Sequence, residues 1–200
     1  MRFLHAAAVL TLAVPPGLAA QQPGGAPPAH PIVAAFRGRI LALHRNLWQA
    51  FDSIPASLFS YQPTPAQQTV GYIAQHLASD NNFFCNQFGE MKAERPAKDT
   101  ETPDSARATW PKDTLVAKLK ESFAFCERAI GQLGDASLAE QVAITFGGNT
   151  RNVTRASMVI GHALDLADHY SQIANYMRLN HILPPTARPR PGRGGDGEDG

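Results

Sequence analysis

The chain has 200 residues, enough for one domain with flanking segments. Apolar residues make up 44% of it, a normal share for a soluble domain with a hydrophobic core, and the formal net charge is +1. Because no basic stripe runs through the middle of the chain, nucleic acid is excluded as an expected partner.

The N-terminus has the pattern of an export signal. Arg2 precedes an apolar run over residues 3–14, and Pro15, Pro16 and Gly17 end that run before the small residues Ala19 and Ala20. We therefore predict that residues 1–20 are a signal peptide, cleaved near Ala19 or Ala20, and that the protein is periplasmic or extracellular. The run is short for a membrane span, so no stable membrane anchor is expected after cleavage. The alternative is an uncleaved anchor.

Two further segments lack the pattern of a folded core. Residues 21–30 are rich in Gly, Pro and Gln and predict a flexible lead-in. The Pro-, Arg- and Gly-rich residues 186–200 cannot bury enough apolar surface to offset the entropy of ordering, which predicts a disordered tail. The folded domain is expected over residues 31–185.

Apolar side chains recur at helical spacing in four segments of that domain. The first two are predicted at about residues 32–51 and 68–89, separated by Pro55 and the stretch 61–65, YQPTP. The third follows a polar loop over residues 94–111, with Asp113 as its expected N-cap and its apolar stripe ending at Ile130. The fourth is expected to start near residues 152–154 and to end near Asn180, before Pro184.

The connection between the third and fourth segments contains the β-like part of the chain. Residues 137–141 predict a short helical turn, and residues 142–146 an extended piece too small for a sheet. Four long amphipathic helices with one or two long connections predict an all-α fold, a four-helix bundle.

Three histidines lie inside the predicted second and fourth helices. Asp165 and His169 are four residues apart and differ by about 40° around the helix. His162 is seven residues before His169 and differs from it by about 20°, so all three residues share one face of the fourth helix. His76 lies in the middle of the second helix and is the available third ligand. His76, Asp165 and His169 are therefore a candidate site for a divalent metal with an open coordination position.

Other interpretations of these residues stay open. An Asp and a His on one helix face are often solvated or hydrogen-bonded to each other without any metal. His162 is expected to be a satisfied core or boundary histidine, or else to join the metal ligands in place of Asp165. His44, on the first helix, is expected at the surface or the boundary. Cys85 and Cys126 form a disulfide in an oxidising compartment or stay buried thiols in a reducing one.

Two stretches resemble the DinB-like superfamily of four-helix bundles. NLWQAF together with SYQPTPAQQTVGYIAQHLASDNNFFCNQFGE is similar to that family's first helix, its Pro-containing connection and its second helix. DLADHYSQIANYMRLNHILPP is similar to the fourth-helix signature, and the resemblance covers about residues 35–186.

The resemblance implies a metal site with one departure from the family pattern. The family's metal-binding histidines fall on His76 and His169, while Asp165 stands where a histidine is usual. A carboxylate is a competent ligand for zinc, nickel or manganese, so a His-Asp-His site remains possible, and lost metal binding is the alternative. Relatives with cysteine at similar positions favour a structural disulfide between Cys85 and Cys126.

The resemblance also limits what function to expect. It implies a metal-dependent enzyme of the thiol-dependent transferase or hydrolase type, acting on a small-molecule substrate that the sequence does not identify. The alternative is a non-catalytic bundle that binds a small molecule or a protein partner. Bundles of this type often pair, so a homodimer is a further expectation.

Overall fold

A computed structural model describes residues 28–189 of the chain. The predicted signal peptide, most of the predicted lead-in and residues 190–200 of the predicted tail lie outside the described residues. Of the lead-in, His30 precedes the first helix directly, and of the tail, residues 186–187 belong to the short 3-10 helix η3, Pro185–Ala187. No helix in residues 28–189 is both long and apolar enough to cross a membrane.

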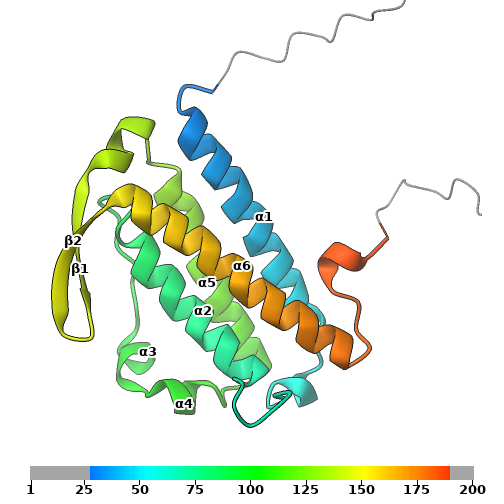
Figure 1. The fold of residues 1–200 in the computed structure, drawn as a ribbon. Coiled ribbons are helices and arrows are strands. Elements are labelled where there is room, and N and C mark those ends of the chain that lie inside the picture. Colours follow the sequence, from blue (N-terminus) through cyan, green and yellow to red (C-terminus); the bar gives the residue numbers. More distant parts are fainter. Residues whose placement is uncertain (1–27, 190–200) are drawn as a thin grey trace, which may run out of the picture.

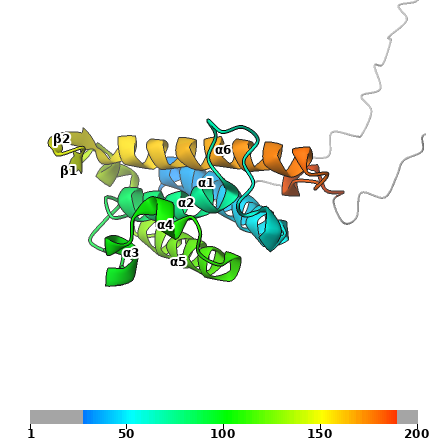
Figure 2. The same cartoon turned by 90° about the horizontal axis from the view of Figure 1, so that it is seen from below.

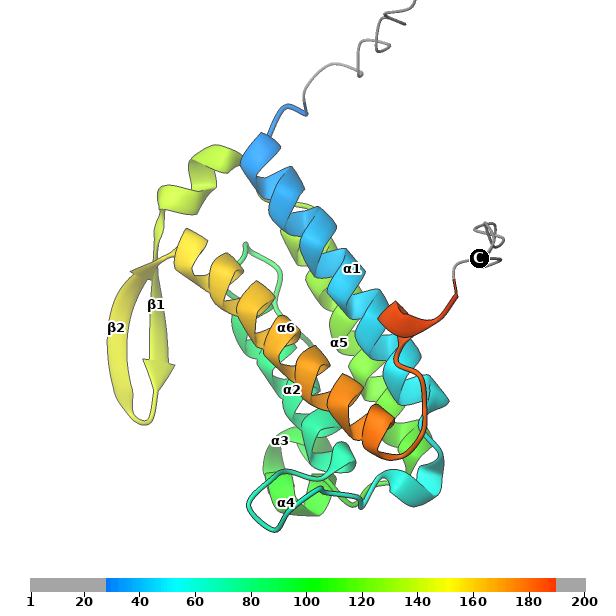
Figure 3. The ribbon, with the colours of Figure 1, turned by 45° about the vertical axis from the view of Figure 1, so that its right-hand side comes forward.

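Four long helices form the bundle, as predicted (Figures 1 and 3). They are α1 (Pro31–Ser53), α2 (Val70–Cys85), α5 (Lys112–Ile130) and α6 (Arg155–Leu179). Helix α6 packs on α1 and α2, and α5 packs on the same two helices from the other side. Figure 2 shows α5 and α6 at opposite sides of the bundle, so residues of α2 and α6 can meet directly.

Polar contacts define where these helices begin. The hydroxyl of Thr69 accepts a hydrogen bond from Tyr72 N at 3.1 Å, and the hydroxyl of Thr154 accepts one from Ser157 N at 3.2 Å. Both are N-caps, which satisfy amide groups that the helix leaves without partners. Asp113 does not have the predicted capping role, because α5 already begins at Lys112 after Pro111, whose fixed φ suits a helix start.

The N-terminus of α1 is capped from a distant segment. The carboxylate of Asp135 accepts hydrogen bonds from Ile32 N at 3.1 Å and Val33 N at 2.9 Å. Asp135 opens the 3-10 helix η2 (Asp135–Ala139), close to the predicted turn at residues 137–141. This contact ties the connection before the hairpin to the start of the chain's first helix.

The connection before α6 contains a β-hairpin, which differs from the prediction of one isolated extended piece. Strand β1 (Gln141–Phe146) pairs antiparallel with β2 (Asn149–Thr154), from Gln141 opposite Thr154 to Phe146 opposite Asn149. Gly147 and Gly148 join the strands with φ of 57° and 79°, as a tight two-residue hairpin turn requires. The glycine pair therefore fixes the hairpin and delays the start of α6 to Arg155.

The polar loop after α2 carries two short helices, α3 (Ala97–Glu101) and α4 (Asp104–Arg107). A single 3-10 turn, η1 (Ala56–Leu58), lies in the connection between α1 and α2. The core lies between the four long helices and includes these fully buried side chains: Ile40, Leu47, Phe51, Ile73, Leu77, Phe88, Leu119, Ile130, Leu166 and Ile173.

Candidate metal centre

Two helical pairs of one histidine and one aspartate face each other between α2 and α6. On α2, His76 and Asp80 are four residues apart, with 3.1 Å between His76 Nε2 and Asp80 Oδ2. On α6, Asp165 and His169 have the same spacing, with 3.4 Å between Asp165 Oδ1 and His169 Nε2. Side chains at this spacing lie one turn apart on the same helix face, so each helix presents one imidazole and one carboxylate.

The two pairs meet at one place. One ligand atom from each of His76, Asp80 and His169 lies within 4.8 Å of the other two, and the imidazole rings of His76 and His169 meet edge to face with centroids 5.1 Å apart. The structure thus brings together His76 and His169, as the sequence predicted. It adds Asp80, and it places Asp165 beside His169 on the same helix.

Asp80 is the residue that the sequence analysis missed. His76 and Asp80 are four residues apart in the sequence, the same spacing as Asp165 and His169, so this spacing could have identified Asp80. The family pattern directed attention to the position of Asp165 instead. With Asp80 included, the site has two imidazole and two carboxylate groups.

One side of this cluster is open to solvent and the other is closed. The side chains of His76 and Asp80 are 30% and 25% exposed, whereas that of His169 is 8% exposed. A small solute can therefore reach the cluster from the side of α2, while α6 forms its wall.

The charges in the cluster perturb each other. Burial raises the pKa of Asp80 to about 6, and the neighbouring negative charge of Asp165 adds to the rise, while His76 and His169 oppose it. Burial alone would lower the pKa of His169, but its hydrogen bond to Asp165 and the charges of Asp165 and Asp80 outweigh burial and raise it. The carboxyl of Asp80 and the imidazole of His169 therefore both bind protons more readily than usual, and a cation can take the place of those protons.

The unpartnered atoms test whether a metal ion fits here. Asp165 Oδ2 and His169 Nδ1 are buried without a hydrogen-bond partner in residues 28–189. Buried polar atoms are normally paired, so these two mark a site whose polar atoms are not all satisfied by the protein. Nitrogen and oxygen donors of this kind suit zinc, nickel or manganese, so the residues fit a divalent cation.

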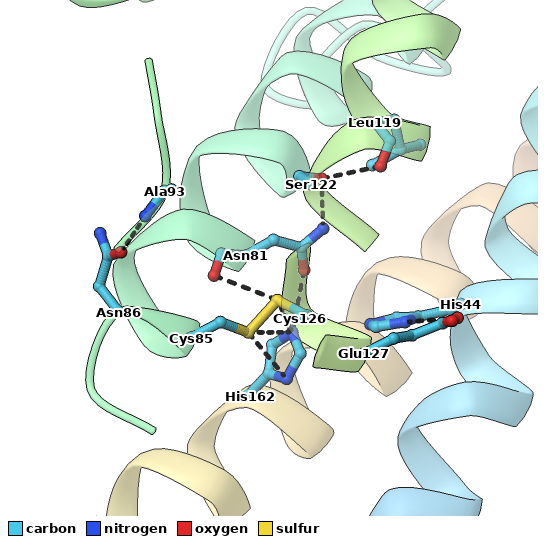
Figure 4. Close-up of a disulfide and its surroundings, with 10 residues drawn as sticks. All are labelled: His44, Asn81, Cys85, Asn86, Ala93, Leu119, Ser122, Cys126, Glu127 and His162. Carbon is cyan, nitrogen blue, oxygen red and sulfur yellow. Dashed lines mark hydrogen bonds and ion pairs between the residues drawn. A yellow bond between two sulfur atoms is a disulfide. The ribbon is translucent and has the colours of Figure 1, made fainter. Parts of the chain in front are cut away.

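The remaining predicted residues form a second, buried cluster around a disulfide (Figure 4). Cys85 and Cys126 are joined in a disulfide, with Cα atoms 5.3 Å apart, and neither cysteine is free. His162 is fully buried beside it, with Nε2 2.9 Å from Asn81 Oδ1. His162 is therefore a hydrogen-bonded core histidine, and the structure does not bring it to the cluster of His76 and His169.

His44 also lies in this second cluster, which corrects its predicted surface position. It is buried because α1 turns this face toward α5, where the imidazole stacks on Phe123 with ring centroids 4.3 Å apart. Burial lowers the pKa of His44 to about 3 and holds that of His162 well below its usual value. The imidazole of His44 is therefore neutral, and its 3.8 Å approach to Glu127 is not an ion pair.

A separate cavity of about 380 Å³ lies between α2, α5 and the loop that carries α3 and α4. Gln75 lines it, and both polar atoms of its buried amide have no hydrogen-bond partner within the described part of the chain. Trp110 and Arg107 also line the cavity, whereas His76 and His169 do not.

Comparison with known proteins agrees with this fold. The family model of the DinB superfamily matches residues 39–173, and no curated protein matches the sequence. Among solved structures, a DinB-like protein from Bacillus cereus is 16% identical with a TM-score of 0.59, covering 76% of this chain and 95% of that one. A conserved protein from Enterococcus faecalis is 14% identical with a TM-score of 0.54, covering 74% of this chain and 96% of that one. At these identities the two structures support the fold alone, and the match over residues 39–173 shows that the chain belongs to the DinB superfamily.

Proposed function

We propose that this protein is a metal-dependent enzyme of the thiol transferase or hydrolase type, with its centre between α2 and α6. The observation that carries the proposal is the convergence of His76, Asp80 and His169 at a place with one solvent-exposed side. These three residues would hold the cation. A divalent cation bound here would lower the pKa of a bound thiol or water and so supply a nucleophile at neutral pH.

Asp165 has a different role from the other three residues. Its Oδ1 faces His169 Nε2, and the atoms of His76, Asp80 and His169 form the compact group without it. Outer carboxylates of this kind orient a ligating imidazole and increase its basicity. Asp165 therefore positions His169, and its own Oδ2 stays available as a further oxygen donor.

The test begins with metal-free full-length protein. It is loaded separately with zinc, nickel or manganese and assayed for two reactions: displacement of chloride from an electrophilic chloroarene by 2-mercaptoethanol, with release of a proton, and hydrolysis of a phenyl ester. The proposal expects turnover with at least one metal and its loss in His76→Ala. His181→Asn, a change at an exposed histidine beyond α6, is the matched control and should keep full turnover. No rate above that of the metal-free protein with any of the three metals would contradict the proposal.

The two reaction types are separated by a cobalt-loaded sample. Titration with 2-mercaptoethanol produces sulfur-to-cobalt charge-transfer absorption if a thiol enters the coordination shell. The transferase type requires this absorption, whereas the hydrolase type predicts its absence while ester hydrolysis continues.

The cavity beside Gln75 favours a second candidate, a non-catalytic bundle that binds a small molecule. The unpartnered amide of Gln75 offers one donor and one acceptor to a ligand, and Trp110 offers an aromatic surface. A fluorescent-probe or fragment screen by NMR would detect such binding. This candidate requires binding that is lost in Gln75→Leu and unaffected by metal removal.

We further propose that the protein acts outside the cytoplasm, on the strength of the N-terminal pattern alone. Expression of the full chain followed by N-terminal sequencing of the mature protein tests this. A new N-terminus near residue 20 or 21 in an exported fraction supports export, and retention of Met1 in the cytoplasm contradicts it.

We also propose a homodimer, which the exposed apolar face of α6 supports. Ile160 and Leu164 are 43% and 65% exposed, one turn apart on that helix. Light scattering should give a dimer mass that Leu164→Asp reduces to the monomer. A monomeric unmodified protein at micromolar concentration would rule the dimer out.

A further inference from the structure

The inner cluster receives one chemically reactive side chain from each of the four long helices. His44 comes from α1, Cys85 from α2, Cys126 from α5 and His162 from α6. Cys126 Sγ lies 3.9 Å from His162 Nε2, and one ligand atom from each of His44, Cys126 and His162 lies within 4.8 Å of the other two. Figure 4 shows the imidazole of His162 directly beside the disulfide, with His44 approaching from α1.

His44 lacks the partners that a buried imidazole normally has. Neither ring nitrogen has a hydrogen-bond partner within residues 28–189, and the side chain is 3% exposed. Burial of an unpaired polar group is destabilising, so an apolar side chain stacked on Phe123 would be more stable here. A buried imidazole without a partner therefore points to a ligand.

A chain of hydrogen bonds determines which nitrogen of His162 is free. Ser122 Oγ donates to Leu119 O at 2.8 Å, so it can accept from Asn81 Nδ2, which lies 2.8 Å away. Asn81 Oδ1 then faces His162 Nε2 at 2.9 Å and must accept its proton. The lone pair of His162 is consequently on Nδ1, which lies 3.9 Å from Cys85 Sγ. A metal-bound imidazole commonly donates its other N–H in this way.

Two cysteines and two histidines are the ligand set of structural zinc sites. In a tetrahedral site, ligand sulfur and nitrogen atoms are about 3.5 Å apart, given Zn–S and Zn–N bonds of about 2.3 and 2.0 Å. The 3.9 Å between Cys85 Sγ and His162 Nδ1 is already close to that spacing. In a disulfide the sulfurs are bonded to each other and carry no thiolate, so they are not ligands until the bond is reduced.

We propose that reduction of the Cys85–Cys126 disulfide converts this cluster into a zinc site formed by both thiolates, His162 Nδ1 and His44. A dithiol reductant supplies two electrons and two protons, becomes a disulfide itself, and leaves two protein thiols. Zn²⁺ then replaces the two thiol protons, which pass to solvent, and four Zn–ligand bonds form. The bundle thus has a covalent link in its oxidised state and a metal link between all four helices in its reduced state.

The test uses full-length His169→Ala protein, in which the centre between α2 and α6 is disabled. One sample stays oxidised, and the other is reduced with dithiothreitol, which is removed by anaerobic gel filtration. Zn²⁺ is added, and bound metal is measured after desalting. The proposal expects one zinc per chain in the reduced sample and none in the oxidised one. Because His169 is absent, this outcome does not depend on the proposed enzymatic function.

The ligands are identified with two matched variants and one spectroscopic probe. Co²⁺ in the reduced protein should give thiolate-to-cobalt absorption. His44→Phe keeps the stacking on Phe123 and should lower zinc affinity by about 100-fold or more, whereas His181→Asn should not change it. Helical circular dichroism monitors folding, and zinc should restore any helix that reduction removes. A reduced protein that binds no zinc, or equal zinc affinity in His44→Phe, would overturn the proposal.

Discussion

The inner and outer clusters each contain a histidine from α6, but the surroundings of the two imidazoles differ. His162 and His169 are seven residues apart on α6, about 10 Å along the helix axis. His169 is flanked by Asp165 and Asp80, which raise its pKa, whereas His162 is flanked by a disulfide and an amide, and burial lowers its pKa. The outer cluster, formed by His76, Asp80, Asp165 and His169, is charged and partly exposed, while the inner cluster is neutral and buried.

We therefore expect the outer cluster to bind a cation and the inner cluster to stabilise the bundle. A cation-binding centre needs charged side chains and access to solvent, and both make close apolar packing less favourable. The inner cluster is buried, and its disulfide joins α2 to α5.

The largest effect is expected from removal of the disulfide. The bond closes a loop with a sequence separation of 41, so Cys85→Ser/Cys126→Ser should lower the free energy of unfolding by about 4 kcal/mol. Urea unfolding measures this change. Divalent-metal affinity of the outer cluster should stay within about twofold in the folded variant. A loss of unfolding free energy below about 1 kcal/mol, or a large loss of metal affinity at the outer cluster, would show that the two clusters do not have separate roles.

Removal of a ligand from the outer cluster should mainly lower metal affinity, whereas removal of the disulfide should mainly lower the free energy of unfolding. His169→Ala is expected to lower the affinity of the oxidised protein for divalent metal at least about 100-fold, equivalent to about 2.7 kcal/mol of binding free energy. Isothermal titration calorimetry with the unmodified protein and His181→Asn as references measures this loss. Equal affinity in His169→Ala would mean that the cation binds elsewhere.

The free energy of unfolding should fall at acidic pH because of the buried His44. The pKa of His44 is about 3 in the folded protein and 6.5 when unfolded, so below pH 6.5 the unfolded state binds the extra proton. Stability contributed by the neutral imidazole is present above pH 6.5 and is lost as pH falls toward 3, by about 1.4 kcal/mol per pH unit. Urea unfolding of metal-free protein at several pH values should give this slope difference between the unmodified protein and His44→Phe. Identical slopes would contradict this, because they would mean that His44 takes up its proton as readily in the folded state as in the unfolded state.

The smallest effect distinguishes the two aspartates. Asp165→Asn should weaken metal binding about 10-fold, because it removes a group that orients His169. Asp80→Asn should weaken binding further, since Asp80 belongs to the compact group with His76 and His169. Calorimetry on both variants gives the order, and a larger loss in Asp165→Asn would make Asp165 the ligand.

The sequence predicted the four long helices because their apolar spacing is regular and their ends carry Pro, Gly or Thr. It missed the hairpin, since pairing of 141–146 with 149–154 depends on positive φ at two glycines rather than on an apolar pattern. It identified His76 and His169 through family resemblance and helix spacing. Asp80 and the burial of His44 depend on how α2 meets α6 and how α1 meets α5, and neither contact can be read from one helix alone.

A divalent cation is expected to bind between α2 and α6 at the outer cluster. Anomalous scattering from a crystal of the oxidised, zinc-loaded protein tests it most directly. One strong peak is expected within bonding distance of His76, Asp80 and His169, and none beside the disulfide. A peak bound by other residues, or no peak at full zinc loading, would contradict it.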